Sequence, residues 1–256
     1  MDSSYAITLN NCAAACVENG NFSDAFTYFK QALDNSKSMI RSESSNVNGK
    51  NDDEHDNNSP LKFGLDDLMD TRDNEMTSCT PSNGGFVYQN AIHIDDSYVC
   101  QLASSNLDLN TTVSTVVVFN LALTHHLVAI TESDEKTPAA ASGQSYKLLL
   151  RKASKLYQAV LKILKNSRLH EQGRSSIFFV SSILNNLGHV HNLLDEKEES
   201  RYYYCQLVST LMLVIEHHNS HHQEESERNR KINTLDELTC FFHCLVEGNA
   251  AVAPAA

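Results

Sequence analysis

The sequence lacks tryptophan, and it also lacks an uninterrupted apolar run of the length that crosses a membrane. Such a run has about 20 residues, so we expect no membrane-spanning segment. Met1 to Tyr5 place no basic group ahead of an apolar stretch, so we expect no signal peptide. Basic residues are few, because 20 Lys and Arg stand against 32 Asp and Glu, for a formal net charge of −12. This charge argues against a general nucleic-acid-binding protein.

Motifs of catalysis are missing as well. The chain has no glycine-rich phosphate loop, nucleophile elbow, paired-carboxylate motif or HExxH. We therefore expect a protein that is not an enzyme and that carries no cofactor. Seven cysteines are an odd number, and Cys12, Cys16 and Cys205 lie in apolar helical patterns. We interpret these three as reduced core thiols of a cytoplasmic or nuclear protein.

What the sequence does contain is a helical pattern, clearest between Leu9 and Leu33. Its first half repeats apolar and small residues at three- and four-residue spacing, and Asn19-Gly20-Asn21 then ends that helix. Its second half places one face on a second helix, with Phe22, Ala25, Phe29 and Ala32. Two amphipathic helices with a short loop predict an antiparallel helical hairpin.

This hairpin resembles a tetratricopeptide repeat (TPR), a unit of about 34 residues. Asn11-Cys12-Ala13 stands for the family's x-Leu-Gly and Gly20 for its inter-helix glycine; Leu9 replaces the usual early Trp, and the closing Pro is absent. The pattern returns twice, as Asn120-Leu121-Ala122 with Ala153 and Tyr157, and as Asn186-Leu187-Gly188 with Ser200 and Tyr204. The whole chain also resembles uncharacterised TPR-like algal proteins, which implies no function.

The resemblance implies an all-α, TPR-like α-solenoid of about three antiparallel helical hairpins. We expect a first hairpin at 1–41 and an acidic, largely disordered insertion at 42–111, since much of it is rich in Asn, Asp and Ser. Residues 86–94 alternate enough to form an extended arm along the helices. The second and third hairpins and a C-terminal capping helix would occupy 112–248, before a disordered tail at 249–256. The β-branched run Val113–Val118 also suits a strand, but the pattern continues past strand length, which favours a helix.

The resemblance further implies a binding surface. TPR proteins hold peptides in a concave groove lined by the first helix of each repeat, and a helical partner would use the same surface. Projected onto this sequence, the groove residues are Asn10, Ala14, Phe119, Leu123, His126, Asn185, His189 and Asn192. The first helix lacks the Lys with which one TPR subset grips a C-terminal carboxylate, so that mode is not expected.

A stripe of basic residues lies on the predicted helix that follows residue 145. Arg151, Lys155, Lys162 and Lys165 recur at spacings that share one helix side. One interpretation is a solvated face, and the other is a docking surface for an acidic protein. An alternative partner for the basic residues within 147–174 is RNA, which some helical repeats read as single strands. The net charge and the absence of interleaved aromatics make nucleic acid the weaker alternative.

A metal site is the remaining alternative. His217 and His221 have the i, i+4 spacing that places two imidazoles on one metal if the helix continues, and Cys240, His243 and Cys244 offer further ligands. A polar helix end and core packing explain the same residues, so we predict no metal. The sequence therefore favours a non-catalytic scaffold or adaptor that binds a protein or peptide partner.

Overall fold

The computed structural model describes residues 3–46, 88–94, 106–134, 142–166 and 174–220. Within these ranges the chain forms six helices and no strand, which confirms the all-α class. The helices are α1 (Ser3–Glu18), α2 (Phe22–Asn46), α5 (Asn106–Asp134), α6 (Ser142–Asn166), α7 (Arg174–Leu193) and α8 (Lys197–Ser220). The helix predicted over the β-branched run is therefore correct, and that run lies inside α5.

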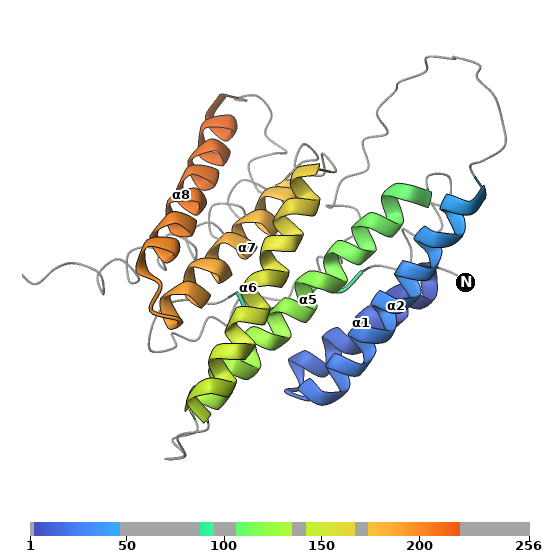
Figure 1. The fold of residues 1–256 in the computed structure, drawn as a ribbon. Coiled ribbons are helices and arrows are strands. Elements are labelled where there is room, and N and C mark those ends of the chain that lie inside the picture. The colour runs from blue at the N-terminus through green and yellow to red at the C-terminus, as the bar shows by residue number, and fades with distance from the viewer. Residues whose placement is uncertain (1–2, 47–87, 95–105, 135–141, 167–173, 221–256) are drawn as a thin grey trace, which may run out of the picture.

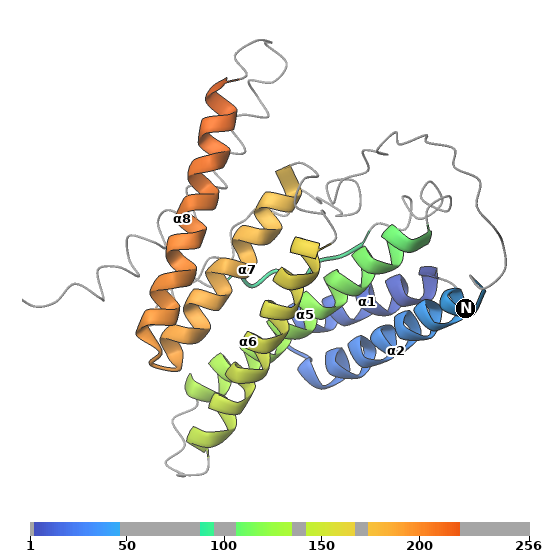
Figure 2. The same cartoon turned by 45° about the horizontal axis from the view of Figure 1, so that its top comes forward.

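The helices pack as three consecutive pairs. α1 packs on α2, α5 on α6 and α7 on α8, and the pairs meet through α2 with α5, α1 with α5, and α6 with α7. Figure 1 shows the pairs side by side in chain order, and Figure 2 shows α1, α5 and α7 following one another along the array. Each first helix therefore neighbours the first helix of the next pair.

The turns within the first and third pairs have the same backbone geometry. In the first turn Gly20 has φ 71°, and its N–H donates to Val17 C=O while Asn21 N–H donates to Cys16 C=O. The third turn repeats both bonds with Asp195, at φ 62°, as its left-handed residue. Both are Schellman turns, which satisfy carbonyls that a helix end would otherwise leave unbonded.

Small residues sit where two helices touch. Ala13 and Ala25, on α1 and α2, are fully buried. On the third pair, a Cβ added to Gly188 would lie 2.7 Å from the Tyr204 ring, so only glycine fits without a shift. Ser200 Oγ donates to Gly188 C=O at 2.8 Å, which ties α8 to α7 at the same point.

α5 is the central helix and is buried on several sides. Within it, 109–133 forms the one described helix that is apolar and long enough to cross a membrane by length and composition. The length of this apolar helix is not evident from the sequence, because Asn, Thr and His residues interrupt the apolar run. Most of that window is buried between neighbouring helices. A helix that is apolar all round is also what the core of a helical protein requires.

Two differences from the sequence interpretation concern local detail. Cys12 and Cys205 are exposed and Cys16 is half-buried, so the expectation of core thiols is wrong for the first two. α2 continues to Asn46 and α5 begins at Asn106, so both helices enter the range assigned to the insertion. The rest of the insertion apart from 88–94, the capping helix and the tail lie outside the described residues.

Candidate functional site

Residues 88–94 cross the first helices of all three pairs. The segment has no helix, and Figure 2 shows it running from beside α7, past α5, toward α1. This is the region in which the sequence predicts an extended arm. Its direction opposes the chain order of the pairs, since its first residue lies at the third pair and its last at the first pair.

Three asparagines, one on each first helix, hold the main chain of this segment. Asn11 accepts a hydrogen bond from Ile94 N–H at 2.8 Å and donates to Ile94 C=O at 2.7 Å. Asn120 makes the same pair of bonds with Ile92, both at 2.8 Å. Each carboxamide thus offers its oxygen to an N–H and its nitrogen to a C=O of one residue, as a neighbouring β-strand would.

The third member acts at the other end of the segment. Asn186 accepts from Tyr88 N–H at 2.9 Å and donates to Tyr88 C=O at 3.1 Å. We name Asn11, Asn120 and Asn186 the asparagine ladder. In an extended chain the N–H and C=O of alternate residues face the same side, and the three bonded positions of the segment are all even-numbered. The ladder therefore forms hydrogen bonds with one edge of an extended backbone.

Asn10 reinforces the middle of the ladder. It is fully buried on α1, donates to Ile92 C=O at 3.0 Å and accepts from Asn120 Nδ2 at 3.0 Å. The carbonyl of Ile92 thus receives two amide donors from two different helices. A buried amide left without a partner costs about 1–3 kcal/mol, so these bonds decide where the segment lies.

The side chains of the segment differ in how far they are enclosed. Ala91, Ile92 and Ile94 are buried and belong to the main hydrophobic core. The Tyr88 ring lies 6.1 Å from that of Phe119, centroid to centroid. His93 is partly exposed, and its Nε2 lies 2.9 Å from the carboxylate of Glu18. Asn90 is exposed.

A buried aromatic and histidine layer supports the ladder. Phe119 packs edge-on against Phe179 with centroids 5.0 Å apart, and Asn186 Nδ2 also donates to the Tyr157 hydroxyl at 3.0 Å. His126 Nε2 and His189 Nδ1 lie 3.0 Å apart and share one hydrogen bond between α5 and α7. At least one of these two rings is therefore neutral, since two protonated rings would offer only donors.

Burial sets the charge state of this layer. It lowers the pKa of His189 to about 4 and, with the repulsion of His189 added, lowers the pKa of His126 well below its usual value. Burial also lowers the pKa of His125 to about 4, with a smaller contribution from Lys152. Burial raises the pKa of the Tyr157 hydroxyl, and its bond from Asn186 opposes the rise in part. At neutral pH the layer is uncharged.

The residues that the sequence projects into the groove fall into two groups. Asn10 and Phe119 contact the segment, through the bonds and ring contact given above. The others lie in or beside the core of the first helices: Ala14, Leu123, His126, Asn185 and His189 are buried, and Asn192 is half-buried and accepts a bond from Lys197.

The ladder residues themselves were not among the projected groove residues. The sequence carries a signal for them, because each is the Asn that precedes the Leu-Gly-like pair: Asn11-Cys12-Ala13, Asn120-Leu121-Ala122 and Asn186-Leu187-Gly188. An amide at one repeat position on three first helices indicates a function that all three share.

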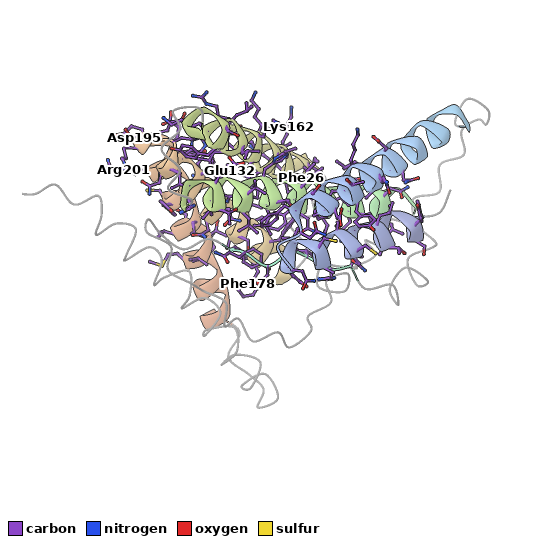
Figure 3. The ribbon with its side chains drawn as sticks, turned by 90° about the horizontal axis from the view of Figure 1, so that it is seen from below. Phe26, Glu132, Lys162, Phe178, Asp195 and Arg201 are labelled. Atoms are coloured by element: carbon purple, nitrogen blue, oxygen red, sulfur yellow. The ribbon has the colours of Figure 1, made fainter. Side chains whose placement is uncertain are left out.

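The basic stripe lies on the outer side of α6. Arg151, Lys155, Lys162 and Lys165 are all exposed. Figure 3 shows Lys162 projecting from one side of the array, while Phe178 lies on the opposite side. The stripe belongs to α6, whereas the ladder residues belong to α1, α5 and α7, so the two sets of residues lie on different helices.

A second polar chain links α6 to the third pair. Ser154 Oγ lies 3.1 Å from His191 Nε2, and His191 Nδ1 lies 2.6 Å from Glu196 Oε2. This is the order of nucleophile, base and carboxylate in a hydrolase, which also needs free N–H donors for an oxyanion. Ser154 lies inside α6, where the neighbouring N–H groups are bonded within the helix. We interpret the chain as a structural link between helices.

The metal site that the sequence offers only as an alternative lies mostly outside the described residues. Among the described residues, no three His, Cys, Asp or Glu side chains gather as a metal site would require. α8 contains His217 but ends at Ser220, and His221, Cys240, His243 and Cys244 lie outside the described residues.

Comparison with known proteins adds no relative: no family model, curated protein or solved structure matches this chain.

Proposed function

We propose that the protein is a TPR-like α-solenoid that acts as a non-catalytic scaffold and binds an extended segment of a partner protein across its first helices. The observation that supports this function is the asparagine ladder, because it holds an extended main chain on the first helices of three successive pairs. Such bonds recognise a backbone without regard to its side chains. A surface of this kind suits peptide recognition, in which main-chain bonds supply affinity and side-chain pockets supply specificity.

The equivalence of the ladder positions supports the TPR-like part of the proposal. The same number of residues separates Asn11 from Gly20 and Asn186 from Asp195, so ladder and turn keep one register in two pairs. A repeat protein built by stacking one unit would show this regularity. The basic stripe on α6 adds a second surface, for which an acidic partner is the complementary choice.

The experiment compares three forms of the full-length protein as baits in an extract of its source. They are the wild type, a ladder variant (Asn11→Ala with Asn120→Ala) and a stripe variant (Lys155→Glu with Lys162→Glu). Circular dichroism and a thermal melt first establish that both variants are folded. Quantitative mass spectrometry then measures each captured protein on each bait.

We expect at least one protein to be retained by the wild type and lost by the ladder variant. Retention of that protein by the stripe variant would assign its binding to the ladder alone, and its loss there would show that both surfaces contribute. If folded baits of all three kinds capture the same proteins in equal amounts, no partner uses either surface and the proposal fails.

A further inference from the structure

The segment 88–94 is held as a bound peptide would be held. Seven hydrogen bonds join its main chain to amide side chains. In each bond the donor residue and the acceptor residue are at least 28 positions apart in the sequence. Every one of those side chains belongs to a first helix. The groove that the proposed function requires is therefore filled by the chain itself.

We propose that 88–94 is an internal ligand, and that a partner displaces it with an extended segment of the same pattern. This inference rests on the proposed function and specifies its partner. The pattern is an aromatic residue, two unrestricted positions, a small residue, an aliphatic residue, a basic residue and a second aliphatic residue. Each restricted position follows from what surrounds its counterpart in the structure.

The aliphatic positions correspond to Ile92 and Ile94, which are 4% and 2% exposed. Both also carry ladder bonds, so their main chain and side chain are fixed together. A charged side chain at either position would lose its hydration without gaining a partner. Ala91 precedes them at 7% exposure, and a small residue is expected there. The aromatic position corresponds to Tyr88, which lies against Phe119.

The basic position corresponds to His93, which lies beside Glu18. It is partly exposed, so the carboxylate attracts a longer Lys or Arg without burying it. A Glu or Asp at this position would meet the Glu18 carboxylate and be repelled. The contact therefore gives the groove a charge preference that the ladder bonds lack.

A tethered occupant competes strongly with a free one. Tethering gives an internal ligand an effective concentration on the order of millimolar, so a free peptide of equal affinity binds the wild type only weakly. Weakening the internal copy alone should uncover the groove. Ile92→Asp does this, because it damages the segment and leaves every ladder residue in place.

The test uses a fluorescein-labelled synthetic peptide of residues 86–96, FVYQNAIHIDD, and measures anisotropy against full-length protein. We expect Ile92→Asp protein to bind the peptide at least 10-fold more tightly than the wild type. A control peptide that carries Ile92→Asp and Ile94→Asp should bind neither protein. If folded Ile92→Asp protein does not bind the natural peptide, the proposal is wrong.

The charge preference gives a second arm in the same background. The peptide with His93→Lys should bind more tightly than the peptide with His93→Glu. Glu18→Lys in the protein should reverse that order. Equal binding of the two peptides to both proteins would remove the basic residue from the pattern.

A measurement on the wild type decides the question even if Ile92→Asp does not fold. Hydrogen exchange should show the amides of Ile92 and Ile94 opening at least 10-fold more often than buried amides of α5, because the segment leaves while the helices stay folded. Equal protection would make 88–94 a permanent part of the core and overturn the proposal. The wild type could instead form a concentration-dependent dimer in sedimentation that Ile92→Asp abolishes. This result would identify a second copy of the chain as the occupant and would overturn the proposal of a different partner protein.

Failure here is distinguishable from failure of the proposed function. If the peptide does not bind, but capture from the extract still depends on Asn11 and Asn120, the scaffold function stands and the displacement inference is wrong.

Discussion

Gly188 is the position at which one added methyl group tests the packing of the third pair. A Cβ there would lie 2.7, 2.8 and 2.9 Å from three carbon atoms of the Tyr204 ring, closer than carbon atoms approach in real structures. The ring must therefore move, and Ser200 restricts how far α8 can yield because its hydroxyl bonds to the carbonyl of Gly188. Overpacking of this kind costs about 1–3 kcal/mol.

Gly188→Ala also has an opposite effect. Alanine favours a helix interior over glycine by about 1 kcal/mol, so the net loss of stability in the wild-type background is about 0–2 kcal/mol. In a Tyr204→Ala background the clash is gone and only the gain remains. There Gly188→Ala should raise stability by about 1 kcal/mol. The difference between the two backgrounds, about 1–3 kcal/mol, measures the clash itself.

Urea unfolding of the four proteins, followed by circular dichroism, gives the free energies for this cycle. Thermal melts should agree, at about 2–4 °C for each kcal/mol in a chain of this size. Gly20→Ala is the matched control: a Cβ there meets no atom within 4 Å, and its cost comes from the positive φ. It should therefore be equally destabilising with and without Tyr204. If Gly188→Ala has the same effect in both backgrounds, the packing argument is refuted.

Three further predictions concern acid pH, the ladder and a turn. Burial lowers the pKa of His189 to about 4 and that of His126 below its usual value, so the unfolded chain binds protons more readily than the folded chain as the pH falls through the usual histidine pKa. From pH 7 to 5 the free energy of unfolding should therefore fall by about 2 kcal/mol because of His189, with a further loss from His126, and urea midpoints should lose this pH dependence when both are changed to Gln. Asn120→Ala leaves the N–H of Ile92 without its acceptor and should cost about 1–3 kcal/mol in the same assay, whereas a loss below 0.5 kcal/mol would mean that water replaces the amide. Asp195→Gly should raise stability by about 0.5–1 kcal/mol because Asp195 has a positive φ, and a drop would show that its side chain contributes more than its strain costs.

The helix pairs follow from short-range patterns, and these were readable in the sequence. Gly20 ends its helix at the turn that the sequence predicts, since a left-handed residue is a local requirement. Asp195 takes the same left-handed conformation in the turn of the third pair. Gly188 and Ser200 were recognisable as positions of the repeated pattern, although the atoms that they contact were not.

The face of α1 was harder to assign, and the reason is Asn10. Its buried side includes Ile7, Asn10, Ala14 and Val17, so a polar residue interrupts the stripe. If only apolar residues are considered, the predicted buried face of α1 includes Cys12, which is exposed in the structure. Asn10 is buried because its amide binds Ile92, which lies far away in the sequence. The spacing of residues within α1 therefore gives no indication that Asn10 binds Ile92.

The link of Ser154, His191 and Glu196 was invisible for a similar reason. From the sequence, Ser154 is expected to be one more polar residue on the exposed side of α6. It is buried because α7 packs beside α6. His191 has its two partners on α6 and in the turn of the third pair, where no local pattern connects them. Contacts between elements that are distant in sequence depend on the packing of the pairs.

The position of 88–94 along the chain has a consequence for synthesis on the ribosome. This segment emerges after α1 and α2, so Asn10 and Asn11 are the first amides that it meets. Asn120 follows with α5, and Asn186 appears only when the third pair is made. Until α5 is made, Ile92 and Ile94 lack part of their covering, and a ribosome that pauses before α5 would present these apolar residues to other nascent chains. Translation through α5 is therefore the step that covers Ile92 and Ile94, whereas Tyr88 gains its ladder bonds only when α7 is made.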